Sequence, residues 1–429
     1  MKNRFPFFVL AALLTIGMLN CSVKVVSVPT DDEKITAEVD LLSAAYIPDS
    51  AFLAYCQSQM TKWDKKKRDG KLSPVEAAAV TRINVSGEKI TSLAGIEYFT
   101  GLTTLSCWGN QLTALDVSKN TKLVFLNCWD NQLTALDVSN NTALAYLYCW
   151  DNQITALDVS KNTKLINLAC SNNQLTALDV SKNTKLISCS GNQLTALDVS
   201  KNTALTELNC FNNQLTALDV SKNTALKELF CSSNQLTTLD ITGCTELKEL
   251  NCWGNQLSAL DVSKNTKLKW LHCWDNQLTT LDVSKNTKLK WLLCSDNQLT
   301  VLDVSKNTKL KKLDCWSNQL SALDVSKNTA LKELICSSNQ FTALDVSKNT
   351  ALKELFCHDN QLTSLDISHN IALTELECLN NPGDGESKFP VKAWFGNRSI
   401  PSSLPSQSNW SGSWESNGKK IMVDYYYTE

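Results

Sequence analysis

Histidine is scarce in this chain of 429 residues, which contains only His272, His358 and His369. So few imidazoles leave little material for acid–base catalysis or for metal ligation. The charge balance is also nearly even, with 41 Lys and Arg against 43 Asp and Glu, so the net charge is −2. Such a balance gives no electrostatic reason to expect a nucleic acid as partner. No second apolar segment follows the first 20 residues, so we expect the rest of the chain to be a soluble, extracytoplasmic protein.

The amino terminus resembles an export signal. Lys2 and Arg4 precede an apolar run over residues 5–19, which is too short for a membrane span. Cys21 follows in the sequence MLNCS, which resembles the lipobox of bacterial lipoproteins, in which the cysteine is acylated. Ordinary signal cleavage is the alternative, but no A-x-A-like site is present. We therefore predict a signal peptide over 1–20 and a lipid-anchored tether over 21–45, with the lipid as the only membrane contact.

Most of the chain consists of one repeated sequence motif, L-x-x-L-x-C-x-x-N-Q-L-T-x-L-D-V-S-x-N-T-x, with a period of 21 residues. Such a period indicates a solenoid in which each turn contacts only its neighbours. The step from Cys170 to Cys189 is 19 residues, and we predict that the loss falls in the turn before the strand, with Ile187 in the leucine position. The repeat contains 14 of the 17 cysteines: Cys107, Cys128, Cys149, Cys170, Cys189, Cys210, Cys231, Cys252, Cys273, Cys294, Cys315, Cys336, Cys357 and Cys378.

Each repeat contains a short strand pattern. In ELNCWGN, Leu250 and Cys252 alternate with polar or aromatic neighbours, which is the period of two that a strand requires. Successive turns would stack these strands into a parallel, in-register sheet on the concave face, with few or no helices on the convex face. Asn255 would turn inward and bond the backbone of adjacent turns, which satisfies polar groups in the bend.

The ends of the repeat region are predicted to be capped. Residues 46–80 have two helix starts, with Asp49 and Ser73 as N-cap residues and Glu76 completing a capping box. Between them, the loop 65–76 has the outline of an EF-hand but places lysines where calcium needs oxygen ligands, so cation binding stays open. The solenoid would cover 81–381, and the non-repeating tail 382–429 would form a small β-rich cap.

The repeat is similar to the leucine-rich repeat, and its details resemble the internalin family of bacterial surface proteins. The cysteine at a strand leucine position, the length of 21 residues and the LTALDVSKNT half of the repeat support the resemblance over residues 47–381. The resemblance implies a leucine-rich repeat solenoid and adhesion to proteins or glycans on host or neighbouring cells. It fails at the ends, because no LPxTG wall-sorting signal is present. The lipobox-like start implies anchoring in the cell envelope, at the outer membrane or cell surface.

Two rows of reactive side chains follow from the repeat. The cysteines could form disulfides, bind metal or serve as small buried hydrophobic residues. Strand spacing is too wide for disulfides and a straight row does not converge on a metal, so we predict core packing. The states of Cys56 and Cys244, outside this row, stay open. The aspartates that include Asp261 could bind divalent cations in a strip, but we predict that they cap the following turn.

The outward strand positions carry the candidate binding site. The residues at the core positions hardly vary between repeats, whereas those at the outward strand positions vary freely. The outward positions carry aromatic residues in two groups, which are separated by Asn167, Ala169, Ser171, Ser188 and Ser190. We predict a recognition surface for a protein or glycan, with no cofactor, metal or catalytic group. The alternatives are rings that only shelter the sheet, or a spacer or scaffold without a ligand. The predicted ligand-binding residues are Trp108, Phe125, Trp129, Tyr146, Tyr148, Trp150, Trp253, Trp270, His272, Trp274, Trp291 and Trp316.

Overall fold

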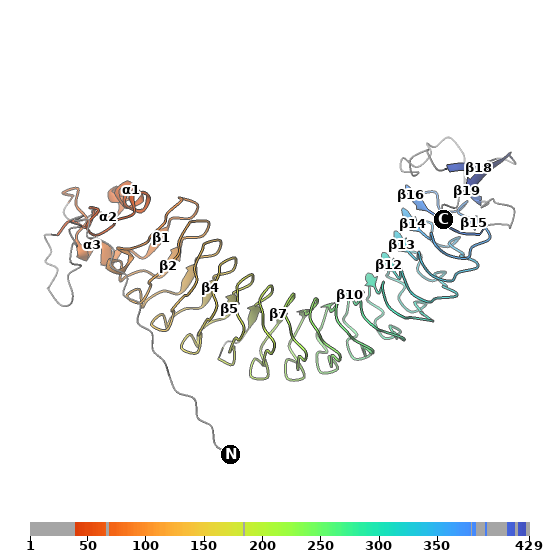
Figure 1. Cartoon of the computed structure of the whole chain (residues 1–429), viewed down its shortest axis with the longest axis horizontal. Coiled ribbons are helices and arrows are strands. Elements are labelled where there is room, and N and C mark those ends of the chain that lie inside the picture. The colour runs from red at the N-terminus through yellow and green to blue at the C-terminus, as the bar shows by residue number, and fades with distance from the viewer. Residues whose placement is uncertain are drawn as a thin grey trace, which may run out of the picture.

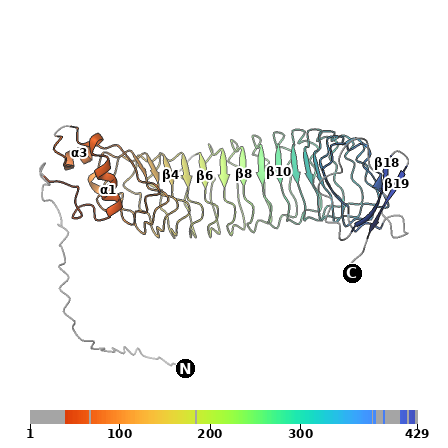
Figure 2. The same cartoon turned by 90° about the horizontal axis from the view of Figure 1, so that it is seen from above.

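The computed structural model shows a curved solenoid with a sheet along its inner face (Figure 1; Figure 2). It describes residues 39–65, 68–182, 185–378, 380–382, 391–392, 410–416 and 419–425. The predicted signal peptide, Cys21 and most of the tether lie outside this range. Among the described helices none is both long and apolar enough to cross a membrane.

The concave sheet has 15 parallel strands in chain order, each hydrogen-bonded to the next turn. Leu250 pairs with Leu271 and Leu271 with Leu292, so equivalent repeat letters lie side by side. This confirms the predicted parallel, in-register sheet of a leucine-rich solenoid. The strands are β1 (Arg82–Asn84), β2 (Thr104–Ser106), β3 (Phe125–Asn127), β4 (Tyr146–Tyr148), β5 (Asn167–Ala169), β6 (Leu186–Ser188), β7 (Glu207–Asn209), β8 (Glu228–Phe230), β9 (Glu249–Asn251), β10 (Trp270–His272), β11 (Trp291–Leu293), β12 (Lys312–Asp314), β13 (Glu333–Ile335), β14 (Glu354–Phe356) and β16 (Glu375–Glu377).

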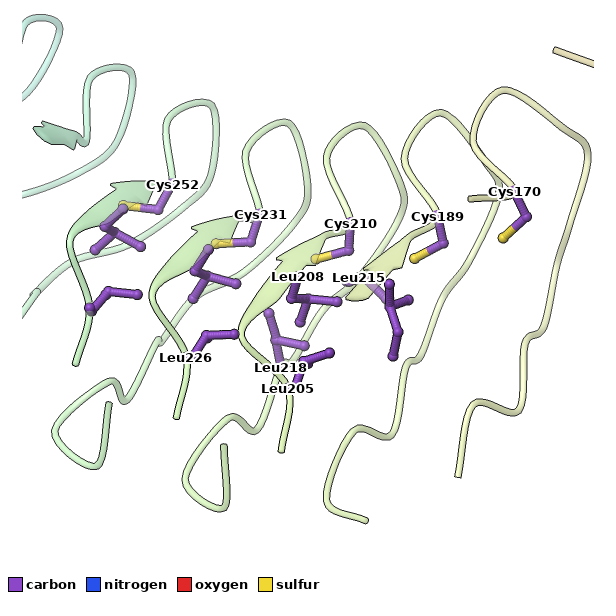
Figure 3. Packing of buried hydrophobic residues seen from close by; sticks show 14 of the residues in the cluster. Cys170, Cys189, Leu205, Leu208, Cys210, Leu215, Leu218, Leu226, Cys231 and Cys252 are labelled. Atoms are coloured by element: carbon purple, nitrogen blue, oxygen red, sulfur yellow. The ribbon is translucent and has the colours of Figure 1, made fainter. Parts of the chain in front are cut away.

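The core is a column of leucine, valine and cysteine enclosed by the turns. In β9, the central Leu250 is fully buried, whereas its neighbours Glu249 and Asn251 are partly exposed on the concave side. Cys252 follows the strand and is also fully buried. Figure 3 shows this residue and its equivalents in a row, one in each turn. Because no turn buries its leucines alone, stacking of turns supplies the hydrophobic stabilisation.

The short repeat does not interrupt the sheet. In β6, Ile187 is 1% exposed and pairs with Leu168 on one side and Leu208 on the other. Cys189 remains in the buried row after the 19-residue step. The deletion therefore falls before the strand, as predicted.

Asparagines hold the turns together along two rows. Asn255, three residues after the cysteine, donates from Nδ2 to the carbonyls of Cys231 and Cys252 at 3.1 and 3.0 Å. Its Oδ1 accepts from the N–H of Leu236 at 3.0 Å. This confirms the inward amide. The second row, in the SKNT turn on the convex side, was not foreseen: Asn265 is fully buried and donates to the carbonyls of Ile241 and Cys244.

The amino-terminal end carries the predicted helices, α1 (Ser50–Ser58), α2 (Met60–Trp63) and α3 (Pro74–Ala79). Asp49 accepts from the N–H groups of Ala51 and Phe52, and its other oxygen accepts from Thr91. This second bond ties the cap to the first repeat, which also contains the 3₁₀ turn η1 (Ile96–Tyr98). Ser73 and Glu76 form the expected capping box at the start of α3.

Short strands gather at the other end of the solenoid. β15 (Leu365–Asp366) pairs in parallel with β17 (Val391–Lys392), and β17 pairs in parallel with β18 (Trp410–Ser416). β18 and β19 (Lys419–Tyr425) form an antiparallel pair. Strands therefore occur in the tail, in line with the β-rich character expected from its sequence.

Candidate binding face on the concave sheet

A left-handed bend follows the cysteine in each repeat and sets where the next side chain lies. Two residues after the cysteine, φ is positive, for example +63° at Gly254 and +52° at Asp275. Glycine, asparagine and aspartate tolerate this conformation best, which explains why they dominate this position. The residue between cysteine and bend is therefore held at the end of the concave strand, where one copy follows another in register.

The first predicted group of aromatics divides into a stack and a cluster. Trp129 stacks on Trp108 and on Trp150, with ring centroids 4.7 and 4.2 Å apart and the planes within 7°. Nearby on the strands, Phe125 contacts Tyr146 and Tyr148 at centroid distances of 6.2 and 5.5 Å. A groove of about 510 Å³ lies beside this cluster and is lined by Arg82, Thr103, Thr104, Val124, Phe125 and Tyr146.

The second group is looser. Trp253 and Trp274 stack at 4.2 Å, and Phe211, which the sequence did not single out, leans toward Trp253 from two turns away at 5.6 Å. Ser232, in the turn between them, is only 1% exposed. The rings of Phe211 and Trp253 therefore meet over the buried Ser232 and leave no open space between them.

Three more predicted residues of this group lie on the strands. His272 lies 6.3 Å from Trp291 with nearly parallel rings. Burial lowers the pKa of His272, and the Lys312 charge lowers it further, so the imidazole is neutral near pH 7. Trp270 has the ammonium of Lys269 over its ring at 5.6 Å.

Stacking changes how the tryptophans can meet a ligand. Where rings stack on their neighbours, their faces are covered, and the edges and the ends of each stack remain for contact. The exposed fractions are 36% for Trp108, 42% for Trp291 and 39% for Trp316, whereas Trp129, Trp150, Trp253 and Trp274 are half-buried. Contact between a ring face and a protein or glycan ligand is therefore expected mainly at the three exposed tryptophans.

The cysteine row lies directly behind this face and is inert. All 14 of its thiols are buried at 0–1% exposure, and no disulfide joins the cysteines within the described residues. Burial raises the pKa of Cys107 and of Cys273 to about 12, so these thiols are protonated at neutral pH. The row is hydrophobic core, as predicted.

Residues 224–265 match the family profile "Leucine Rich repeats (2 copies)", and residues 124–148 match the profile "LVIVD repeat". The functional domain of InlJ from Listeria monocytogenes, which includes a cysteine ladder, is 34% identical, with 83% of each chain covered and a TM-score of 0.64. The chain belongs to the internalin-like leucine-rich repeat family.

Other solved structures agree with this placement. A leucine-rich repeat protein from Leptospira interrogans is 26% identical to this internalin-like protein, with 74% of this chain and 88% of that chain covered and a TM-score of 0.66. The internalin inlF from Listeria monocytogenes is 25% identical, with 84% and 99% covered and a TM-score of 0.56. A search of curated proteins finds no match to the chain.

The aspartate row of this internalin-like protein caps turns. Oδ1 of Asp261 accepts from the N–H of Ser263 at 2.8 Å, and Asp282 does the same for Ser284. The hydrogen bond from the backbone of Ser263 lowers the pKa of Asp261, which keeps it ionised. No group of three or more His, Cys, Asp or Glu suited to a metal occurs among the described residues. The Asx-type cap is confirmed.

The predicted gap between the aromatic groups is a serine network. Ser171 is within 2.9 Å of both Ser188 and Ser190, oxygen to oxygen. Asn167 donates from Nδ2 to the Tyr148 hydroxyl at 3.3 Å, at the edge of the first group. Small hydroxyl side chains therefore separate the two aromatic groups at the short repeat of this internalin-like protein.

Proposed function

We propose that this protein is a non-catalytic adhesion protein of the cell envelope, which binds a surface protein or glycan of a host or neighbouring cell. The concave face, with the aromatic residues named above, is the proposed ligand surface. One observation carries the proposal. The buried positions of the repeat keep the same residues from turn to turn, whereas aromatic side chains gather at outward positions, where many turns carry serine. A fold that needed only the solenoid would not require Trp291 or Trp316 at 42% and 39% exposure.

The internalin-like family supports the same interpretation, because its members share this solenoid and the InlJ domain also has a cysteine ladder. Trp and Tyr are the side chains most often responsible for affinity in protein interfaces. An array of glycans and surface proteins, probed with the purified full chain, is the direct way to identify the ligand.

Replacing Trp253, Trp274 and Trp316 together by serine is expected to leave the fold intact, because Ser171, Ser190 and other turns carry serine at the same position. We expect binding to the ligand that the array identifies to weaken about tenfold or more, since each aromatic anchor contributes more than about 1 kcal/mol. Affinity is measured on immobilised ligand and folding by circular dichroism. The same change at Trp108, Trp129 and Trp150 shows which group carries the contact. Unchanged affinity in both variants would refute the proposed site.

Cys21→Ala is expected to release the protein from membranes. Several acyl chains on one cysteine anchor stably, because each buried CH₂ contributes about 0.8 kcal/mol. Fractionation of cells that express the full chain, with Cys56→Ala as the matched cysteine control, measures this. If the Cys21→Ala chain stays in the membrane fraction, the anchor is not this cysteine.

A further inference from the structure

A row of lysines runs along the concave sheet, one residue before the strands. The N–H of Lys290 donates to the carbonyl of Lys269, and the N–H of Lys311 donates to that of Lys290, both at 2.8 Å. These backbone bonds hold the lysines in register at the strand spacing of about 4.8 Å. The row comprises Lys227, Lys248, Lys269, Lys290, Lys311, Lys332 and Lys353.

The next residue along the chain is a glutamate in most of these turns, so its charge offsets that of the lysine before it. The glutamates are missing from three adjacent turns, where Trp270, Trp291 and Lys312 pair with one another in register. Carboxylates flank this stretch on both sides. They are Glu207, Glu228 and Glu249 on one side and Glu333, Glu354 and Glu375 on the other.

The same three turns also carry additional lysines at the end of the preceding loop. Together with the row and Lys312 they bring seven ammonium groups: Lys267, Lys269, Lys288, Lys290, Lys309, Lys311 and Lys312.

Few carboxylates answer this charge. Lys267 pairs with Glu246, and Lys312 pairs with Glu333, both in the flanking turns. The other five ammonium groups have no carboxylate within ion-pair distance in the part of the chain that the structure describes. Asp314 is the acid on these three strands, and its burial raises its pKa. The three turns therefore form a cationic patch on a face that is otherwise balanced.

Aromatic surface lies inside this patch. The Trp270 ring has the ammonium groups of Lys269 and Lys290 at 5.6 and 5.9 Å from its centroid. Trp291, at 42%, is the most exposed tryptophan among the described side chains. A ligand that met these turns would therefore find positive charge and an apolar ring together.

We infer that the turns of β10, β11 and β12 bind an acidic polysaccharide, a chain of uronate or sulfated sugars. This inference rests on the proposed function and names the ligand class for one part of the face. Carboxylate or sulfate groups pair with the unpaired lysines, and the apolar face of a sugar ring packs on Trp291. The flanking glutamates repel the polyanion and confine it to the three turns.

The regularity of the patch favours a polysaccharide over a folded acidic protein. Lysine returns at the same two positions in three successive turns, so the site repeats by simple translation along the solenoid. A polysaccharide repeats its charged unit by translation as well, whereas a folded protein surface does not. Ring stacking beside charge is also the contact that a sugar, with its apolar ring face, can complete and an acidic side chain cannot.

The test uses the full chain and immobilised polygalacturonate, with dextran sulfate as the sulfated probe and dextran as the neutral control. We expect binding to both polyanions, none to dextran, and an affinity that falls as salt rises. The decisive variant is the triple change Trp270→Glu, Trp291→Glu and Lys312→Glu. Neighbouring turns already carry glutamate at this position, so the variant folds, and its affinity is expected to fall at least tenfold.

A matched control separates a built site from general attraction. Lys264→Glu, Lys285→Glu and Lys306→Glu change charge in the same turns, but beside the capping aspartates rather than at the strand positions. This control is expected to keep most of the affinity, and Trp291→Ser to lose about threefold or more without a change of charge. Equal losses from both triple variants, or tighter binding to poly-L-glutamate or to single-stranded DNA, would overturn the polysaccharide site. If the unchanged protein binds no polyanion, the polysaccharide site is refuted. The proposed adhesive function is not, because it is tested with different tryptophans.

Discussion

The solenoid is expected to unfold when the pH is raised to about 10. Burial raises the pKa of thiols such as Cys107, Cys189 and Cys231 to about 12, against an ordinary value of 9.0. Because folding favours the protonated thiol, its stabilising contribution is complete below pH 9 and is lost as pH rises toward about 12. At about pH 10 each thiol costs the fold about 1.4 kcal/mol, so 14 together cost about 20 kcal/mol. That exceeds the stability of an ordinary domain, which is about 5–15 kcal/mol.

The transition is followed by circular dichroism and by the ultraviolet absorbance of thiolates, which are expected to change together. Tyrosine and lysine also titrate in alkali, so a variant with fewer buried thiols is needed to separate the effect of the thiols from theirs. Val85 occupies the cysteine position in the first repeat and is fully buried, so Cys231, Cys252 and Cys273 can be changed to valine. We expect this variant to unfold at a higher pH. Thiolates that form near pH 9 while the circular dichroism stays native would show that the thiols are not shielded.

Asn255→Ala is expected to lower the free energy of unfolding by about 3–5 kcal/mol. The change leaves the N–H of Leu236 without its acceptor. It also removes one of the two amide donors of the carbonyls of Cys231 and Cys252, which keep the amides of Asn234 and Asn276. A buried polar group left without a partner costs about 1–3 kcal/mol, and each further lost hydrogen bond costs about 0.5–1.5 kcal/mol. Urea unfolding, followed by circular dichroism, measures the change, with the slope checked because repeat arrays can lose cooperativity.

A convex asparagine offers the matched comparison. Cys244 already replaces asparagine in one turn, where its thiol lies 3.6 Å from the carbonyl oxygen of Val220. Asn265 makes two donor bonds, and its Oδ1 has no hydrogen-bond partner among the described residues. We therefore expect Asn265→Cys to cost about 1 kcal/mol, well below the cost of Asn255→Ala. Equal costs for the two variants would mean that the additional hydrogen bonds of the Asn255 side chain contribute nothing measurable to stability.

The repeat made much of the fold predictable, because each turn serves as an internal comparison for the others. Alternation around Leu250 and Cys252 gave the strand and its buried side. The spacing between strands predicted that the cysteines pack in the core. The position of Asp261 before a short polar turn predicted that it caps this turn. Each of these depends on contacts within one turn or between equivalent letters, which the sequence contains directly.

The sequence by itself thus determined the parallel sheet, the unbroken short repeat, the thiol core and the outward position of the aromatic residues. Only the tertiary structure decided how those outward residues meet. The stacking of Trp129 between its neighbours and the approach of Phe211 toward Trp253 across a whole turn depend on ring orientation, which no spacing specifies. The unforeseen role of Asn265 depends on carbonyl groups that the previous turn presents. The physical reason is the same in each case: the hydrogen-bonded ladder fixes the distance between turns, but side-chain torsions and neighbouring turns decide what fills that distance.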